Sequence, residues 1–244
     1  MLVIFDFDGV LVDSEAVGLS VEIDALRRLG CRVDVPSYFE AALGCTDEER
    51  IWRDFASAAG ISLPSDFAER VRAEIAETFS HGLAVMPGAE ELLQRLDSMG
   101  IRYCLASGSR PERLKRNLAL TGLDRYLGNN IFSGVEVPKG KPAPDLFLLA
   151  AERMGARPAD CVAVEDSPAG VRGARRAGMR VLGFTGGSHF RLFPQLRQRL
   201  VEAGAQGLAD RLQDIPDLLQ EQGGSGDGAM FSEHQREARG GETL

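Results

Sequence analysis

The sequence predicts an α/β fold, in which a doubly wound parallel sheet carries a small inserted helical module. Short apolar runs alternate with helical patterns along most of the chain, which is typical of parallel strands connected by helices. One long stretch, residues 14–83, shows helical patterns and no strand pattern. The 244 residues are many for one compact unit and few for two full domains, which favours a core domain with an insert.

The expected strands are the short apolar runs. Most of them are separated by helical patterns, so we expect a Rossmann-like sheet whose strands are buried on both faces. The five runs are Leu2 to Phe5, Tyr103 to Ala106, Asn130 to Phe132, Cys161 to Val164, and Arg180 to Phe184.

Three helices of the core are marked by their end signals. An amphipathic pattern begins after Pro87-Gly88 and stops at Gly100, just before the second expected strand. Pro111 suits the first turn of another helix, because its missing N–H has no partner there in any case. A third helix is expected over Ala143 to Met154, followed by Gly155.

The insert is expected to be helical throughout. Amphipathic runs cover Val17 to Leu29 and Ile51 to Ala59, and Trp52 and Phe55 are expected to form its core. We therefore predict a core domain over residues 1–13 and 84–222 and a helical cap over 14–83. Residues 223–244 are rich in Gly, Ser and charge, and this composition predicts a disordered tail.

Charge argues against a nucleic-acid partner. The chain has 28 Lys and Arg residues against 36 Asp and Glu residues, a net charge of -8, whereas binding a phosphate backbone depends on cationic side chains. No apolar run approaches the ~20 residues that cross a bilayer. The N-terminal run lacks a basic leader and contains two aspartates, so a cytoplasmic protein is expected. The four cysteines show no CxxC pairing and are expected to pack as small apolar side chains.

Polar residues of few types follow the predicted strands, where an open parallel sheet binds its ligands. Asp6 and Asp8 follow the first strand, Ser107-Gly108-Ser109 the second, Glu165-Asp166 the fourth, and Lys141 lies in the turn after the third. Several buried carboxylates side by side cost several kcal/mol unless a cation neutralises them. Their oxygen ligands suit Mg²⁺, so Asp6, Asp8, Glu165 and Asp166 predict a magnesium site.

These segments resemble, in order and spacing, the four motifs of the haloacid dehalogenase superfamily of phosphatases. The resemblance covers about residues 1–222, and the helical insert looks like the small cap of that superfamily. It implies a sheet order of 5-4-1-2-3. The matching segments are Asp6-Phe7-Asp8-Gly9-Val10, Ser107, Lys141-Pro142-Ala143-Pro144-Asp145, and Glu165-Asp166-Ser167-Pro168-Ala169-Gly170.

Each motif residue then receives a task. Asp6 is expected to attack phosphorus and form an acyl phosphate, and Asp8 to protonate the leaving alcohol and later deprotonate water. A dehalogenase has no need of that second acid, so Asp8 favours phosphate chemistry. Ser107 and Lys141 are expected to stabilise the transferring phosphoryl group. The resemblance implies Asp166 as the surest metal ligand and Asp8 as a ligand through its backbone carbonyl, and leaves open whether Glu165 acts through water.

Three functions compete. The first is a Mg²⁺-dependent phosphatase of a small metabolite, a sugar, polyol or sugar-acid phosphate. The second is a mutase resembling β-phosphoglucomutase, whose pattern has a histidine and a cap arginine where this chain has Gly18 and Asp47. The third is a binding protein on a phosphatase fold. The complete set of carboxylates argues against the third, and Gly18 and Asp47 argue against the second.

Substrate recognition is expected from the cap and from the second motif. Candidate binding residues on the cap are Glu15, Thr46, Asp47 and Arg50, and those on the core are Ser107, Gly108 and Lys141. We expect a monomer or a small homo-oligomer. His189 follows a Gly-rich stretch that carries no dinucleotide fingerprint, and as a single imidazole it is expected to have an incidental loop role.

Overall fold

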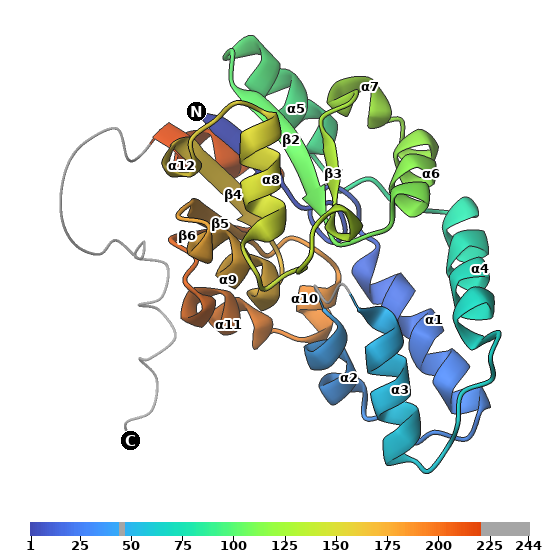
Figure 1. The fold of residues 1–244 in the computed structure, drawn as a ribbon. Helices are drawn as coiled ribbons and strands as arrows, with labels where there is room; N and C mark the ends of the chain where they lie inside the picture. Colours follow the sequence, from blue (N-terminus) through green and yellow to red (C-terminus); the bar gives the residue numbers. More distant parts are fainter. Residues whose placement is uncertain (44–46, 221–244) are drawn as a thin grey trace, which may run out of the picture.

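The computed structural model describes residues 1–43 and 47–220, and within them six parallel strands form one sheet (Figure 1). Their order across the sheet is β3-β2-β1-β4-β5-β6. The α/β prediction is confirmed, and so is the strand order that the resemblance implied. The strands are β1 (Leu2–Phe5), β2 (Arg102–Ser107), β3 (Ile131–Ser133), β4 (Cys161–Glu165), β5 (Arg180–Phe184) and β6 (Gly207–Ala209).

Each expected strand is present, with its ends shifted by at most one residue. The sixth, β6, was not expected. It pairs with β5 at the edge of the sheet, with Phe184 opposite Ala209. Its three residues, Gly-Leu-Ala, contain none of the β-branched or aromatic side chains that mark a strand in a sequence.

Helices cover both faces of the sheet. Leu2 and Ile4 of β1 pack into one apolar cluster with α8, α9 and α11, whereas Val3 and Phe5 pack into a second with α5, α6 and α12. The sheet is therefore doubly wound, as predicted. The core helices are α5 (Ala89–Ser98), α6 (Pro111–Thr121), α7 (Asp124–Leu127), α8 (Asp145–Arg153), α9 (Pro168–Arg176), α10 (His189–Leu192), α11 (Leu196–Ala203) and α12 (Ile215–Gln220).

Four helices form a cap that lies away from the sheet, at the lower right of Figure 1. They are α1 (Glu15–Arg28), α2 (Val35–Ala42), α3 (Glu48–Ala58) and α4 (Phe67–Ser80), and α1 contacts the other three. Trp52 is fully buried between them and Phe55 packs against the same cluster, as expected. The boundaries 14–83 stay a prediction, and the predicted disordered tail lies outside the described residues.

Two neighbouring chain segments join the cap to the core. The N–H of Asp13 donates to the carbonyl oxygen of Ala84 at 2.9 Å, and the N–H of Met86 donates to that of Leu11 at 2.9 Å. The chain therefore enters and leaves the cap side by side, just beyond the end of β1. This arrangement puts the cap over the carboxyl edge of the sheet.

None of the described helices is long and apolar enough to span a membrane. Cys31, Cys104 and Cys161 are buried and unpaired by disulfides, in line with the expected packing role. Cys45 lies outside the described residues.

Candidate active site

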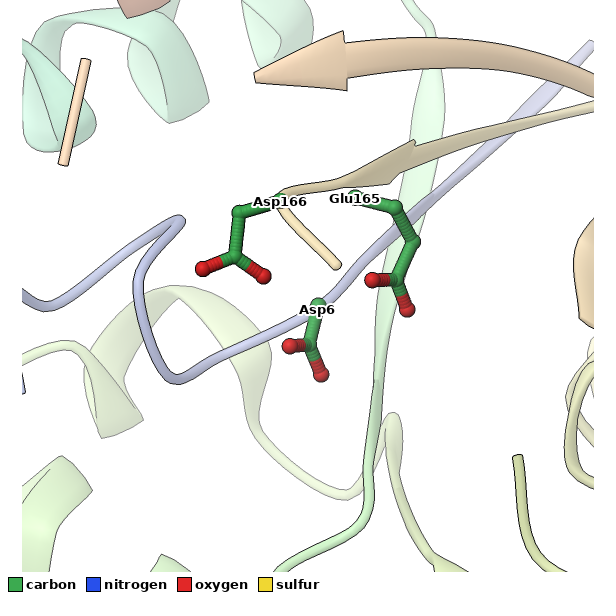
Figure 2. Close-up of side chains that lie close together, drawn as sticks. All are labelled: Asp6, Glu165 and Asp166. Carbon is green, nitrogen blue, oxygen red and sulfur yellow. The ribbon is translucent and has the colours of Figure 1, made fainter. Parts of the chain in front are cut away.

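The carboxyl edge of the sheet brings three acidic side chains together. Asp6 follows β1 and Glu165 and Asp166 lie at the end of β4, and these two strands are direct neighbours, with Phe5 opposite Val164. Figure 2 shows the three carboxylates facing a common space. One oxygen from each lies within 4.8 Å of the others, and all three residues are buried. This is the cluster that the sequence predicted.

Asp166 has an oxygen with no hydrogen-bond partner. Its Oδ2 atom is buried, and no donor among the described residues reaches it with hydrogen-bond geometry. Gly9 leaves the space beside it open: a Cβ on Gly9, whose φ is +78°, would lie 1.8 Å from Asp166 Oδ2. A buried carboxylate oxygen beside a residue that must lack a side chain fits a ligand position for a hard cation.

Lys141 is the cation that the structure places in this cluster. Its side chain is 2% exposed, and Nζ lies 2.8 Å from Asp6 Oδ1 and 2.5 Å from Glu165 Oε1. Burial lowers the pKa of Lys141, but the two carboxylates outweigh this effect, so the net shift of the pKa is upward. Lys141 therefore stays charged and fixes the orientation of Asp6.

One lysine does not neutralise three carboxylates. Burial, reinforced by Glu165, raises the pKa of Asp6 to about 7, even though Lys141 acts in the opposite direction. Burial and the charge of Asp6 raise the pKa of Asp166 well above its usual value, and burial also raises the pKa of Glu165. Such shifts mean that the ionised cluster lacks positive charge, which a divalent cation would supply. The residues present therefore fit Mg²⁺.

Asp8 sits in a different environment from Asp6. Ser14 donates to its Oδ1 at 2.6 Å, Ser109 donates to Oδ2 at 2.7 Å, and Arg113 donates to Oδ1 at 2.9 Å. Burial raises the pKa of Asp8, but Arg113 and the two hydroxyl donors outweigh burial, and the net pKa is lowered. The sequence placed Ser109 after the second strand without giving it a role, and Arg113 and Ser14 were not among the predicted site residues.

A cavity of about 470 Å³ lies over this edge, between core and cap. It is where a substrate would meet Asp6. The candidate residues that line it are Asp6, Asp8, Glu15, Asp47, Ser107, Gly108 and Lys141.

Ser107 ends β2 beside Asp6 and is buried. Its Oγ accepts a hydrogen bond from the N–H of Ser109 at 3.0 Å, which leaves its own hydroxyl proton available for a ligand. The neighbouring Gly108 lines the cavity as well. This pair fits the predicted role of a phosphate-binding loop at the end of a strand.

The remaining candidates, and the second role of Asp47, are as follows. Glu165 and Asp166 are buried and do not line the cavity. Asp47 caps α3 by accepting from the N–H of Arg50 at 3.0 Å. The Arg50 side chain is half exposed, pairs with Asp54 at 3.0 Å and does not line the cavity. Thr46 lies outside the described residues.

His189 differs from its predicted incidental role. It is fully buried, and its Nε2 lies 3.2 Å from Asp166 Oδ2. Burial lowers its pKa, which favours the neutral imidazole, although Glu15 acts in the opposite direction. The residue follows β5, the neighbour of β4, so its position at the end of an adjacent strand was the signal that could have placed it beside Asp166.

A match to a protein-family profile assigns the chain to its family. The sequence profile of haloacid dehalogenase-like hydrolases matches residues 1–178. The chain belongs to this family. The predicted family membership is thus confirmed, and the chain is a hydrolase of the haloacid dehalogenase type.

Relatives of this haloacid dehalogenase-like hydrolase include named phosphatases. The 6-phosphogluconate phosphatase of Escherichia coli (strain K12) is 31% identical over 77% of this chain and 83% of its own length. Hexitol phosphatase A of the same organism is 32% identical over 73% of this chain and 80% of its own length. A solved haloacid dehalogenase-like protein of unknown function from Agrobacterium tumefaciens superposes with a TM-score of 0.78, at 36% identity, covering 89% of this chain and 96% of that one.

Proposed function

We propose that this hydrolase is a Mg²⁺-dependent phosphatase of a small sugar, polyol or sugar-acid phosphate, acting through an aspartyl phosphate on Asp6. The observation that carries the proposal is the paired arrangement of Asp6 and Asp8 on one cavity. Asp6 is held by Lys141 and Asp8 by Arg113 and two hydroxyls, so two like residues have different surroundings. Different surroundings are how two carboxylates acquire different roles.

The metal ligands we propose are the carboxylates of Asp6 and Asp166 and the backbone carbonyl of Asp8, with Glu165 in contact directly or through water. When bound, Mg²⁺ would supply positive charge for the phosphate oxygens and keep the carboxylates ionised. Asp166 Oδ2, buried and without a hydrogen-bond partner among the described residues, supports this assignment.

In the first step, a carboxylate oxygen of Asp6 attacks phosphorus and the bond between phosphorus and the ester oxygen breaks. Asp8 gives its proton to the departing alcohol. Lys141, 2.8 Å from Asp6, and the hydroxyl of Ser107 stabilise the phosphoryl oxygens, where negative charge develops. The alcohol leaves and Asp6 carries the phosphoryl group.

In the second step, water attacks the same phosphorus from the cavity. Asp8, now ionised, takes the water proton, and the bond between phosphorus and Asp6 breaks to release inorganic phosphate. The geometry around Asp8 suits this base role best, because all three donors bind its ionised form. To act as an acid in the first step, Asp8 has to be protonated and released by some of these donors.

Hydrolysis is favoured over phosphoryl transfer to a second sugar. Gly18 lines the cavity where the mutase pattern has a histidine. Among the described residues, a Cβ there would have only Phe79 within 4 Å, at 3.7 Å. Asp47 lines it where that pattern has an arginine. The described residues at these two positions therefore supply neither the imidazole nor the cation with which the mutase pattern would guide a sugar hydroxyl back to the aspartyl phosphate.

A substrate panel tests the proposal. Phosphate release would be measured from sugar, polyol and sugar-acid phosphates with Mg²⁺, and again in excess EDTA. We expect release from at least one class and its loss with the chelator. A folded protein that releases phosphate from none of them would contradict the proposed activity, and full turnover in EDTA would contradict the metal. The proposed substrate is a small phosphorylated metabolite. The cytoplasmic location of the protein stays a prediction.

A further inference from the structure

One face of α1 forms part of the cap wall of the cavity. Glu15, Gly18, Leu19 and Glu22 all line the cavity, and their spacing of three, four and seven residues puts them on one side of the helix. From Glu15 to Glu22 the helix rises about 10 Å at 1.5 Å per residue. Glu15 is close enough to Asp166 and Asp8 for their charges to raise its pKa. Glu22, about two turns further along α1, therefore lies farther from the acidic cluster than Glu15 does.

Glu22 is a buried carboxyl held by two donors. The residue is 6% exposed, and its Oε2 accepts hydrogen bonds from the Tyr38 hydroxyl at 2.6 Å and from the Trp52 indole N–H at 3.1 Å. Both bonds use the same oxygen. The other oxygen, Oε1, has no hydrogen-bond partner among the described residues. Because Glu22 lines the cavity, this oxygen is available to a ligand.

Burying a carboxyl group in the core of the cap costs free energy unless hydrogen bonds or opposite charges compensate it. Tyr38 and Trp52 lie deeper than Glu22, since both are fully buried and neither lines the cavity. They fix the carboxyl from behind and leave one oxygen on the cavity side. This is the arrangement of an orienting group for a ligand.

The cations near Glu22 are already paired with carboxylates. Burial raises the pKa of Glu22, the hydrogen bonds from Tyr38 and Trp52 and the charge of Arg113 lower it, and the charge of Glu48 raises it. Arg113 itself is paired with Asp8 at 2.9 Å. Arg72 on the cap wall is already paired with Glu48 at 2.8 Å and with Glu49 at 2.5 Å. A second carboxylate next to Glu22 would meet a like charge or require one of the two groups to take up a proton.

We propose that Glu22 selects the end of the substrate remote from the phosphate, accepting a hydrogen bond from a distal hydroxyl and disfavouring a distal carboxylate. The substrates are then polyol or sugar phosphates with no second anionic group. This inference rests on the proposed phosphatase function and narrows its substrate class. Gly18, one turn before Glu22, leaves room for the carbon chain between the two ends.

Two phosphate esters of equal length test it. Glucitol 6-phosphate and 6-phosphogluconate carry the same phosphate and the same stereocentres, and they differ only in a hydroxymethyl or a carboxylate group at the far end. The ratio of their kcat/KM values would be measured with Mg²⁺ for the wild type and for Glu22→Gln. Gln keeps an acceptor oxygen for Tyr38 and Trp52 while removing the charge.

We expect the wild type to prefer glucitol 6-phosphate, and Glu22→Gln to reduce that preference at least ~10-fold, since the lost group accepts a charge-assisted hydrogen bond. Most of the change should appear in KM, because Glu22 is not among the residues that we assign to the chemical steps. Tyr38→Phe should reduce the preference less, about threefold, by loosening Glu22 from behind. Melting temperatures of both variants verify that the cap is folded.

Glu69→Gln is the matched control, because it is the same chemical change at an exposed residue of the cap helix α4 that does not line the cavity. It should leave the ratio of the two esters unchanged. A folded Glu22→Gln protein with the wild-type ratio would overturn the inference, and so would a wild type that prefers 6-phosphogluconate.

A binding measurement separates this inference from the proposed function. Affinities of both esters for Asp6→Asn need no turnover, so they test Glu22 even if neither ester is hydrolysed. Hydrolysis of neither would count against the proposed activity on this substrate class. Equal affinity of Asp6→Asn and Asp6→Asn/Glu22→Gln for glucitol 6-phosphate would overturn the role of Glu22.

Discussion

Arg113 of α6 donates to Asp8 Oδ1 at 2.9 Å, and its guanidinium carbon lies 5.5 Å from the ring centre of Phe79 on the cap helix α4. One side chain therefore touches both the residue assigned as acid and base and the wall of the cap. Arg113 therefore connects Asp8 on the core with Phe79 on the cap. The charge of Arg113 also stabilises the ionised form of Asp8, which is the form that the second step needs.

Replacing Arg113 should shift the pH dependence of turnover. Asp8 has a lowered pKa, so its base form persists to low pH, and Arg113→Met should raise that pKa while keeping an apolar stem against Phe79. We expect the acidic limb of the kcat profile to move to higher pH by about one unit. The assay uses p-nitrophenyl phosphate, whose leaving group needs little protonation. Arg116→Gln, on the same cavity wall, is the control, and an unchanged limb in Arg113→Met would refute the link.

Metal binding should remove a pH-dependent loss of stability. Because the pKa of Asp6 rises from 3.8 to about 7 in the folded chain, folding favours its protonated form, and stability is lost as pH rises through that range. Over the whole range the loss of unfolding free energy is on the order of 4 kcal/mol, and about 2 kcal/mol of it lies above pH 5.5. Each kcal/mol corresponds to ~2–4 °C of melting temperature. In chelator the protein should melt lower at pH 8 than at pH 5.5, and Mg²⁺ or Asp6→Asn should narrow the difference. Equal melting temperatures at pH 5.5 and pH 8 in chelator would contradict the lack of positive charge in the acidic cluster.

Hydrolysis should exceed isomerisation of β-glucose 1-phosphate, because Gly18 and Asp47 replace the groups of the mutase pattern. Inorganic phosphate and glucose 6-phosphate would be measured together, with Mg²⁺ and a bisphosphate primer. We expect phosphate to dominate. If glucose 6-phosphate is the main product, the argument from the cap is wrong and the mutase interpretation holds.

The sheet and the acidic cluster were predictable from the sequence because both depend on local patterns. A buried parallel strand is a continuous apolar run, and Asp6, Ser107 and Glu165 follow or end such runs directly. Strand ends of one parallel sheet meet at one edge, so the approximate position of each side chain follows from the order of the strands. Asp6 and Asp166 needed no knowledge of packing.

The residues that the sequence missed depend on packing between distant segments. Arg113 is 105 residues from Asp8, and only the docking of α6 brings them together. In the sequence, Glu22 is one of several charged residues of α1. Its special environment depends on the hydrogen bonds from Tyr38 and Trp52, which come from α2 and α3. His189 is isolated in sequence, yet β5 lies next to β4 and brings it to Asp166.

The two aspartates should fail differently when altered. Asp6→Asn removes the nucleophile and should abolish turnover of every ester. Asp8→Asn keeps the nucleophile and its lysine partner but loses the acid and base. With an activated aryl phosphate, it should release a burst of aryl alcohol and then turn over slowly. Rapid-mixing kinetics would measure this, and a burst from Asp6→Asn but not from Asp8→Asn would reverse the assignment.

The site of the covalent phosphate decides whether Asp6 is the nucleophile. Asp8→Asn would be mixed with an activated aryl phosphate and Mg²⁺, quenched in acid during the burst, digested, and mapped by mass spectrometry. We expect a phosphoryl group on Asp6, in amounts that match the burst, and none in the Asp6→Asn/Asp8→Asn protein. A phosphoryl group on another residue, or a burst with no modified peptide, would contradict the central role of Asp6.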